Sequence, residues 1–318
     1  MHSSPPGLAV LILAYGGPDG LDDVEPYVLD VRGGRPTPPT LIAEIRRRYG
    51  LIGGRSPLLE ITQMQARALE RRLNAEGQSP RVRTYVGMRH WHPYIRDVLP
   101  NIAADGIHRV IGLCMAPHYS KLSVGAYAQK VREAQEGLHD SLDIAIILSW
   151  SDNPLFIQAV VDRVRSAAQR FPLETRDDIT YVFTAHSLPS FILDQGDPYD
   201  SQLRETASAI AGQLGLDPLA WEFCYQSAPA GQTTWLGPSI QEVVVDLARS
   251  GRTNILVTPI GFVADHVEIL YDLDIEARFL AEQAGARFER TESLNAGDDF
   301  IEALAVIVRH QLGEPPVR

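Results

Sequence analysis

The sequence predicts an α/β protein made of two similar doubly wound domains, each a parallel sheet flanked by helices. Short apolar runs bounded by glycine and proline alternate with longer amphipathic segments, the pattern of a parallel sheet with crossover helices. The pattern starts again near residue 179, where a strand ends in residues 185–189 much as the first strand ends in residues 14–18. The chain of 318 residues is long enough for two domains.

The N-terminal domain is expected to span residues 1–175. Its strands are expected, in chain order, at residues 7–15, 83–88, 110–115 and 144–148. Amphipathic segments predict helices at residues 22–31, 41–49, 61–75, 95–104 and 154–170. Loops rich in glycine, proline and arginine, residues 32–40 and 52–57, separate the first three helices.

The C-terminal domain is expected at residues 176–290, and part of it repeats the N-terminal one. A helix–glycine–strand pattern that begins at Ile95 recurs from Ile240, 145 residues later (240 − 95). Because any such segment has a similar apolar pattern, duplication competes with a chance likeness. Duplicated domains would place the active-site cleft between them, at the carboxyl ends of their strands. Tyr15, His186 and the loop before Glu268 all follow such ends.

A column of carboxylates follows the strand expected at residues 254–258. The segment 259–276 is expected to continue as a helix, in which Glu268, Asp272 and Glu276 fall at i, i+4 and i+8 on one face. No lysine or arginine stands between residues 265 and 276. The column therefore indicates either a cation site or a solvated acidic face near a helix N-terminus.

His186 directly follows a strand of the same domain. Neutral imidazole can bind a metal or accept a proton, although a lone loop histidine more commonly caps or hydrogen-bonds the backbone. Histidine together with carboxylates suits Fe(II) among other divalent metals. The histidines that give weaker signals are His90, His92, His118 and His266.

The N-terminal domain has the opposite charge character. Six arginines lie in its loops and helix ends: Arg32, Arg35, Arg46, Arg47, Arg48 and Arg55. They indicate either a solvated basic face or a carboxylate-binding site, since the planar guanidinium fits a carboxylate. With Tyr15 and Tyr49 nearby, such a site would suit a large flat ligand with acidic side arms.

Composition excludes several classes of protein. A hydrophobic content of 45% is that of a globular protein, and a net charge of −11 argues against a nucleic-acid surface. The longest apolar run, Leu8–Tyr15, is too short to span a bilayer. Residues 1–7 lack the charged start of a signal peptide, so a cytoplasmic protein is expected. Two cysteines, Cys114 and Cys224, are too few for a four-cysteine cluster.

Short motifs spread along the chain share their order with a known enzyme family. They are Ala-Tyr-Gly-Gly-Pro at 14–18, Arg-Tyr-Gly-Leu-Ile-Gly-Gly-Arg-Ser-Pro at 48–57, Ala-Pro-His-Tyr-Ser at 116–120, Ala-His-Ser-Leu-Pro at 185–189, Gly-Asp-Pro-Tyr at 196–199, Gln-Ser at 226–227, Trp-Leu-Gly-Pro at 235–238 and Gly-Phe-Val-Ala-Asp-His-Val-Glu at 261–268. On these motifs the chain resembles ferrochelatases from Leu11 to about Leu312. It is most similar to the monomeric coproporphyrin ferrochelatases of Gram-positive type.

The resemblance implies a chelatase-like fold of two Rossmann-like domains, whose last helix, residues 296–314, returns to the first domain. It implies a lyase that forms nitrogen–metal bonds, inserting Fe(II) into coproporphyrin III to give coproheme in heme biosynthesis, with no organic cofactor. His186 and Glu268 match residues that bind the incoming iron or accept pyrrole protons. Asp272 and Glu276 match further residues on the metal route. The matching porphyrin contacts are Tyr15, Arg32, Arg48, Tyr49, Ser56 and Tyr127.

Departures from the family pattern bear on the substrate. The lip region is short and rich in arginine and proline, and residues 313–318 hold no cysteine. Neither stable membrane insertion nor an iron–sulfur cluster is therefore expected, and the tetra-acid coproporphyrin III is favoured over protoporphyrin IX. Gly17 and Gly33 stand where relatives often carry Thr and Arg. The expected partners are the porphyrin, Fe(II) and, transiently, the next enzyme of the heme pathway, with no nucleic acid.

Three alternatives stay open. The same chemistry could act on protoporphyrin IX. A non-catalytic porphyrin or heme carrier could keep the cleft, but the pair His186 and Glu268 argues against it, since a carrier needs no base. A nucleotide-binding protein is disfavoured, because Pro18 interrupts the glycine spacing of the dinucleotide fingerprint.

Overall fold

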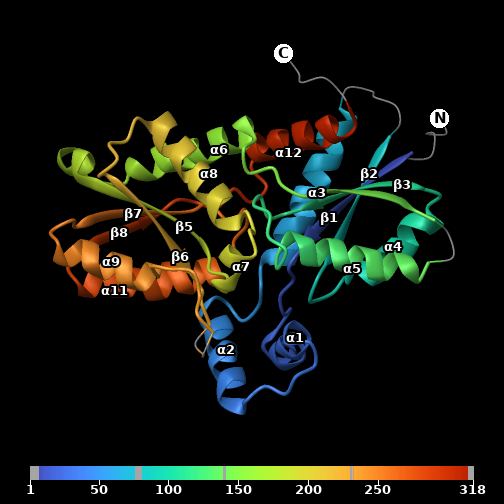
Figure 1. The fold of residues 1–318 in the computed structure, drawn as a ribbon, viewed down its shortest axis with the longest axis horizontal. Helices are drawn as coiled ribbons and strands as arrows, with labels where there is room; N and C mark the ends of the chain where they lie inside the picture. The colour runs from blue at the N-terminus through green and yellow to red at the C-terminus, as the bar shows by residue number, and fades with distance from the viewer. Residues whose placement is uncertain (1–6, 76–80, 139–140, 230, 232, 314–318) are drawn as a thin grey trace. The chain divides into compact units, whose positions relative to one another are not determined.

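The computed structural model of the chain describes residues 7–75, 81–138, 141–229, 231 and 233–313. The chain divides into two compact units, each built on one four-stranded sheet (Figure 1). Unit 1 comprises Met1–Pro117, Lys121–Trp150 and Asn295–Arg318. Unit 2 comprises His118–Ser120 and Ser151–Leu294.

The sheet of unit 1 is parallel, with the strand order β2-β1-β3-β4. Its strands are β1 (Leu8–Ala14), β2 (Val82–Met88), β3 (Arg109–Cys114) and β4 (Asp143–Ile147). β1 is central and buried at every position. Because a central parallel strand is covered on both faces, all its side chains must be apolar or small, which explains the unbroken run Leu-Ala-Val-Leu-Ile-Leu-Ala.

Two pairs of helices accompany this sheet. α3 (Leu58–Asn74) packs against α12 (Asp298–Gln311), and α4 (Ile95–Ala104) packs against α5 (Val124–Glu136) (Figure 1). The helix α5 is not among the helices predicted from the sequence, although its buried residues, Val124, Tyr127, Ala128 and Val131, follow helical spacing. The elements between β1 and α3 are η1 (Leu21–Asp23), α1 (Val24–Val31) and α2 (Pro39–Leu51).

The sheet of unit 2 is also parallel, with the order β6-β5-β7-β8. Its strands are β5 (Ile179–His186), β6 (Trp221–Gln226), β7 (Asn254–Pro259) and β8 (Arg287–Arg290). Its longer helices are α6 (Pro154–Ala168), α8 (Tyr199–Leu214) and α9 (Ile240–Arg249). Its shorter ones are η2 (Leu173–Asp178), α7 (Phe191–Asp194), α10 (Val267–Leu270), η3 (Asp272–Ala277) and α11 (Arg278–Gln283).

The two sheets match strand for strand. β5, β6, β7 and β8 take the places that β1, β2, β3 and β4 hold in unit 1. The helices α4 and α9 likewise come directly before β3 and β7. This confirms the prediction of two similar Rossmann-like domains. Since all strands of a parallel sheet end at one edge, the residues that follow β1 and β2 share an edge of unit 1, and those that follow β5, β6 and β7 share an edge of unit 2.

The limits of the units differ from the predicted split at residue 175. The helix α6 belongs to unit 2, because it packs against α8 and contacts β7. The last helix, α12, belongs to unit 1, where it packs against α3. Residues 314–318, which include the predicted end of that helix, lie outside the described residues. In the described parts of the chain, no helix is both long enough and apolar enough to cross a bilayer.

The prediction of one continuous helix over residues 259–276 is wrong. The chain leaves β7 in a loop, forms the single turn α10 and then the π-helix η3, before α11 begins. The amide of Glu276 donates to the carbonyl of Tyr271 at 2.9 Å, the five-residue step of a π-helix. Asp272 and Glu276 are therefore not one regular α-helical turn apart, and π-helical turns of this kind occur frequently at functional sites.

Candidate active site

His186 is the last residue of β5, and its neighbours fix its backbone. Tyr199 of α8 donates its hydroxyl hydrogen bond to the His186 carbonyl at 3.0 Å. The amide of Ser187 continues the ladder to the carbonyl of Gln226 in β6 at 2.8 Å. The imidazole Nδ1 contacts the carbonyl of Ser187. Because a carbonyl only accepts, Nδ1 carries the proton, and Nε2 of neutral His186 has a free lone pair.

Gly261 lets the loop after β7 come close to His186. A Cβ at this position would lie 2.6 Å from the Cβ of Ala185, nearer than two such atoms approach, so only glycine fits. The next residue, Phe262, places its ring 6.4 Å from that of His186, and Trp235 lies at the same centroid distance. The loop then delivers His266 and Glu268 to the same strand edge.

Glu268 lies between two imidazoles. Its Oε1 is 3.6 Å from Nε2 of His186, and its Oε2 is 3.6 Å from Nε2 of His266. His266 donates from Nδ1 to the Ala264 carbonyl at 3.0 Å, so its Nε2 also faces the carboxylate. The side chain of His266 is 15% exposed and that of His186 is 28% exposed, which leaves His186 the more accessible base.

Burial opposes the charged forms of both Glu268 and His266, and their mutual attraction outweighs it. Burial would raise the pKa of Glu268, but His186 and His266 lower it below its usual value. Burial would lower the pKa of His266, but its contact with Glu268 raises it above its usual value. Glu268 therefore stays ionised, and His266 keeps its proton to a higher pH than free histidine does.

The acidic side chains that follow Glu268 each have their own partner. The hydroxyl of Ser227 donates to Asp272, which is 4% exposed. Gln241 of α9 donates to Oε2 of Glu276 at 2.8 Å. Ser227 follows β6 with a φ of +63°, a left-handed conformation that is uncommon for a residue other than glycine. Together these contacts order the carboxylates through neutral donors.

No group of three or more metal-binding side chains in the described residues is arranged to hold an ion. The residues predicted to meet the metal, His186, Glu268, Asp272 and Glu276, are instead distributed along one strand edge and the elements after it. Such a distribution would let a cation bind a few oxygen or nitrogen ligands at a time, without a complete coordination shell from the protein. The metal-binding role of these four residues stays a prediction.

The corresponding edge of unit 1 is aromatic and basic. Tyr15 directly follows β1, is 38% exposed and lies 4.7 Å from the ring of His90. The guanidinium of Arg89 lies 5.9 Å from the Tyr15 ring and 5.6 Å from the Tyr127 ring. His90 Nδ1 contacts Asp30 at 2.8 Å, which orients its ring. An aromatic surface beside a cation suits a flat ligand with negative side arms.

The remaining predicted porphyrin contacts differ in how open they are. Arg32 ends α1, and among the described residues its buried Nε has no hydrogen-bond partner. Arg48 contacts Glu44 at 2.9 Å, and the hydrogen bonds from Arg47 and Arg48 lower the pKa of Glu44 to about 2. The side chains that lie mostly inside unit 1 are Tyr49, Ser56 and Tyr127, with exposures of 2%, 9% and 5%.

Several residues at these edges have no clear signal in the sequence. Asp30, Arg89, Phe262 and Trp235 come next to predicted site residues only after folding. The sequence gives an indirect indication for three of them. Trp235 and Phe262 lie within the family motifs, and Arg89 directly follows a predicted strand. Asp30 is an ordinary helix residue in the sequence, and its contact with His90 spans 60 residues.

The fold of the chain is shared with a chelatase of known structure. The sirohydrochlorin chelatase SirB from Bacillus subtilis subspecies spizizenii, solved with cobalt, matches with a TM-score of 0.57 at 12% identity, covering 97% of this chain and 96% of SirB. The ferrochelatase family model matches residues 7–312, so the chain belongs to the ferrochelatase family and is an enzyme of that class.

Two relatives extend this finding. The ferrochelatase of Deinococcus radiodurans is 42% identical over 96% of both chains. The coproporphyrin III ferrochelatase of Geobacillus kaustophilus is 39% identical, again over 96% of both chains. These similarities identify the class of enzyme and leave the particular porphyrin to be argued from the residues.

Proposed function

We propose that this enzyme inserts Fe(II) into coproporphyrin III, releasing two protons for each ion inserted. The porphyrin loses its two N–H protons as the metal enters, and no electron is transferred, so the reaction needs a base and no organic cofactor. The observation that supports this role best is the carboxylate of Glu268 between His186 and His266. It supplies a base, a fixed negative charge and a contact for a cation at one strand edge.

His186 is proposed to accept a pyrrole proton. Its Nδ1 is occupied by the Ser187 carbonyl, so Nε2 is the nitrogen that can take the proton. The resulting imidazolium would be stabilised by Glu268, whose carboxylate already faces Nε2 at 3.6 Å. His266 faces the other carboxylate oxygen, and its contact adds to that of His186 in lowering the pKa of Glu268.

Glu268, Asp272 and Glu276 are proposed to pass the cation inward. Glu276 is held by Gln241 and Asp272 by Ser227, neutral donors that leave the negative charge available to an approaching ion. A hydrated ion would exchange water for these oxygens one at a time, which suits a metal that must be released into the porphyrin. Glu268 would be its last protein contact, because the Nε2 lone pair of His186 is needed for the proton.

Unit 1 is proposed to bind the porphyrin. Tyr15 and Arg89 offer a ring and a guanidinium to a planar macrocycle, and the buried Tyr127 supports Arg89. Arg32 has a buried Nε–H that lacks an acceptor among the described residues, as expected of a group that a ligand carboxylate would complete. A tetra-acid porphyrin offers more such carboxylates than a di-acid one, which favours coproporphyrin III. Arg48 would have to exchange Glu44 for a propionate to take part.

Anaerobic incubation of the enzyme with Fe(II) and each porphyrin tests this proposal. Insertion replaces the absorbance bands of the free base by those of the metalloporphyrin. We expect faster turnover and tighter binding with coproporphyrin III than with protoporphyrin IX. A preference for protoporphyrin IX would show that the enzyme makes protoheme, and binding of both porphyrins without insertion would show a carrier.

A further inference from the structure

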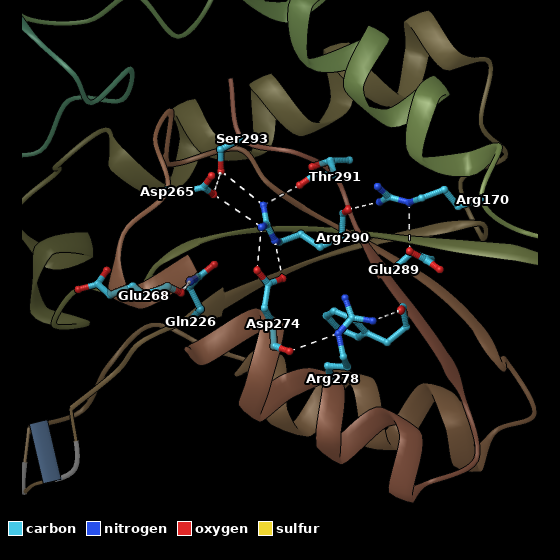
Figure 2. A network of polar contacts seen from close by, with 11 residues as sticks. Arg170, Gln226, Asp265, Glu268, Asp274, Arg278, Glu289, Arg290, Thr291 and Ser293 are labelled. Carbon is cyan, nitrogen blue, oxygen red and sulfur yellow. Dashed lines mark hydrogen bonds and ion pairs between the residues drawn. The ribbon is translucent and has the colours of Figure 1, made fainter. Parts of the chain in front are cut away.

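The segment from Asp265 to Glu276 contains five carboxylates, one histidine and no lysine or arginine. They fall into two groups by their partners. Glu268, Asp272 and Glu276 contact histidines or neutral donors, as described above. The other two, Asp265 and Asp274, contact one guanidinium, that of Arg290 (Figure 2). Among the contacts of the described residues, a guanidinium from outside the segment thus pairs with the two carboxylates that are not proposed to meet the metal.

Arg290 makes these contacts from a fixed position. It is the last residue of β8 and lies opposite Val257 of β7 in the sheet. Its Nε and Nη2 donate to the two carboxylate oxygens of Asp274 at 2.7 and 2.8 Å, a forked pair. Its Nη2 also lies 3.6 Å from Asp265, and its Nη1 donates to the carbonyl of Thr291 at 2.8 Å. The side chain is only 11% exposed.

The two carboxylates joined by Arg290 flank His266, Glu268 and Asp272, and Glu276 lies just beyond Asp274. Asp265 directly precedes His266 in the loop after β7, and the hydroxyl of Ser293 also donates to it at 2.7 Å. Asp274 lies inside η3, two residues from Asp272 and from Glu276. A second arginine, Arg278, donates to the Asp274 carbonyl at 3.2 Å (Figure 2).

We propose that Arg290 is a positioning residue for the iron site, which by joining Asp265 to Asp274 holds His266, Glu268 and Asp272 where the reaction needs them. The proposal rests on the proposed function of Glu268 and His186. Without the guanidinium, two negative charges would face each other in a half-buried place and push the ends of the segment apart. Lysine cannot replace it, because an ammonium group lacks the fork that spans both oxygens of Asp274 while reaching Asp265.

The experiment compares Arg290→Gln and Arg290→Lys with a matched control. Arg72 of α3 forms a half-buried, two-armed pair with Glu302 of α12 in unit 1, so Arg72→Gln removes a similar ion pair far along the chain from the segment. Amide hydrogen exchange over residues 265–277 reports the position of the segment without any substrate. Steady-state rates against Fe(II) and against porphyrin report its consequence for turnover.

We expect faster exchange in this segment for Arg290→Gln and Arg290→Lys, and unchanged exchange there for Arg72→Gln. We also expect both Arg290 variants to lose roughly 10- to 100-fold in kcat/KM for Fe(II), the usual effect of removing a residue that orients a metal-binding group. Porphyrin binding should be unchanged. If Arg290→Gln does not fold, Arg290→Lys carries the test, because it keeps the buried charge compensated.

Three results would overturn the proposal. They are unchanged exchange in folded Arg290 variants, unchanged kinetics with iron despite faster exchange, and complete rescue of both readouts by lysine. Complete rescue would mean that a point charge suffices and that the forked geometry has no role. Failure of the unaltered enzyme to insert iron into any porphyrin is a separate result, which refutes the proposed function while the exchange data still decide whether Arg290 holds the segment.

Discussion

Tyr15 stands at the end of β1 and His186 at the end of β5, although the two strands occupy the same place in sheets of the same order. Around Tyr15 lie Arg89, His90 and Tyr127. Around His186 lie Glu268, Trp235 and Phe262. The comparison shows that the repeated sheet determines the position of the edge where the strands end. The loops that follow the strands determine which side chains lie at that edge.

The difference between the edges is one of charge sign. Unit 1 presents guanidinium groups, which bind carboxylates, and unit 2 presents carboxylates and imidazoles, which bind cations and protons. We therefore assign the acidic porphyrin to the edge of unit 1 and the iron to the edge of unit 2. Changes at the two edges should alter different kinetic constants.

The largest effect is expected at the end of β5. His186→Ala removes the group proposed as base, so kcat should fall by about 10²- to 10⁴-fold, the usual contribution of a general base. Porphyrin binding, measured by fluorescence quenching, should stay close to that of the unaltered enzyme. His310→Ala, which removes an exposed histidine of α12, is the control and should leave both quantities unchanged. Normal turnover of folded His186→Ala would show that His186 is not the base and would contradict the separate roles given to the two edges.

A smaller effect is expected at unit 1. Arg32→Ala should weaken coproporphyrin III binding by about 10- to 100-fold, since a hydrogen bond to a charged group contributes roughly 1.5–3 kcal/mol. Protoporphyrin IX binding should fall less, because that porphyrin has fewer carboxylates. Arg47→Ala is the matched control, as Arg47 is exposed and already paired with Glu44. Equal losses for both porphyrins would show that Arg32 does not recognise propionates.

A change at Glu276, the last of the three carboxylates, should have a still smaller effect on the kinetics. Glu276→Gln should raise KM for Fe(II) up to about 5-fold, as expected for losing a contact of roughly 0.2–1 kcal/mol, with kcat unchanged at saturating iron. Rates measured against Fe(II) concentration check this, with the exposed Glu282→Gln of α11 as control. If kcat of Glu276→Gln falls as far as that of His186→Ala does, the proposal that these carboxylates pass the cation inward is wrong.

The smallest effect concerns stability and pH. The raised pKa of His266 contributes stability that is present below the usual histidine pKa and is lost as the pH rises through the raised value. The lowered pKa of Glu268 contributes stability that is present above the usual glutamate pKa and is lost as the pH falls through the lowered value. The free energy of unfolding of the unaltered enzyme should therefore exceed that of Glu268→Gln most at intermediate pH. The expected difference is up to about 1 kcal/mol.

Denaturant unfolding of both proteins across the pH range measures this difference. It should shrink at acid pH, where Glu268 becomes protonated, and at alkaline pH, where His266 becomes neutral. A difference that stays constant across the range would show that the carboxylate and the imidazole do not interact in the folded protein.

Much of the fold can be predicted because its signals are local. The run Leu8–Ala14 and the glycine and proline after it define a buried strand and its end without any long-range information. The repeat between the segments beginning at Ile95 and Ile240 predicts the second domain from the first. The placement of His186 and Glu268 at one strand edge is also predictable, since His186 ends β5 and Glu268 comes after β7, while their catalytic role stays a prediction.

The parts that cannot be predicted depend on contacts far apart in the chain. The separation of Asp272 and Glu276 along the sequence is the same whichever helix they form, so the sequence pattern cannot distinguish the π-helix η3 from a regular α-helical turn. The pair of Arg290 with Asp274 spans 16 residues and joins a strand that no apolar alternation predicts. Tyr49 carries a family motif, yet it is 2% exposed because α2 turns that face toward α1, where its ring meets that of Tyr27.

The most direct test of the central claim measures initial rates of anaerobic iron insertion over a grid of Fe(II) and coproporphyrin III concentrations, for Glu268→Gln and Arg32→Ala side by side. The account predicts that Glu268→Gln lowers kcat and kcat/KM for Fe(II) while porphyrin affinity is kept. It predicts that Arg32→Ala raises KM for the porphyrin while KM for Fe(II) is kept. If the two variants change the same constant, or if each changes the constant assigned to the other, the division of labour between the two edges is contradicted.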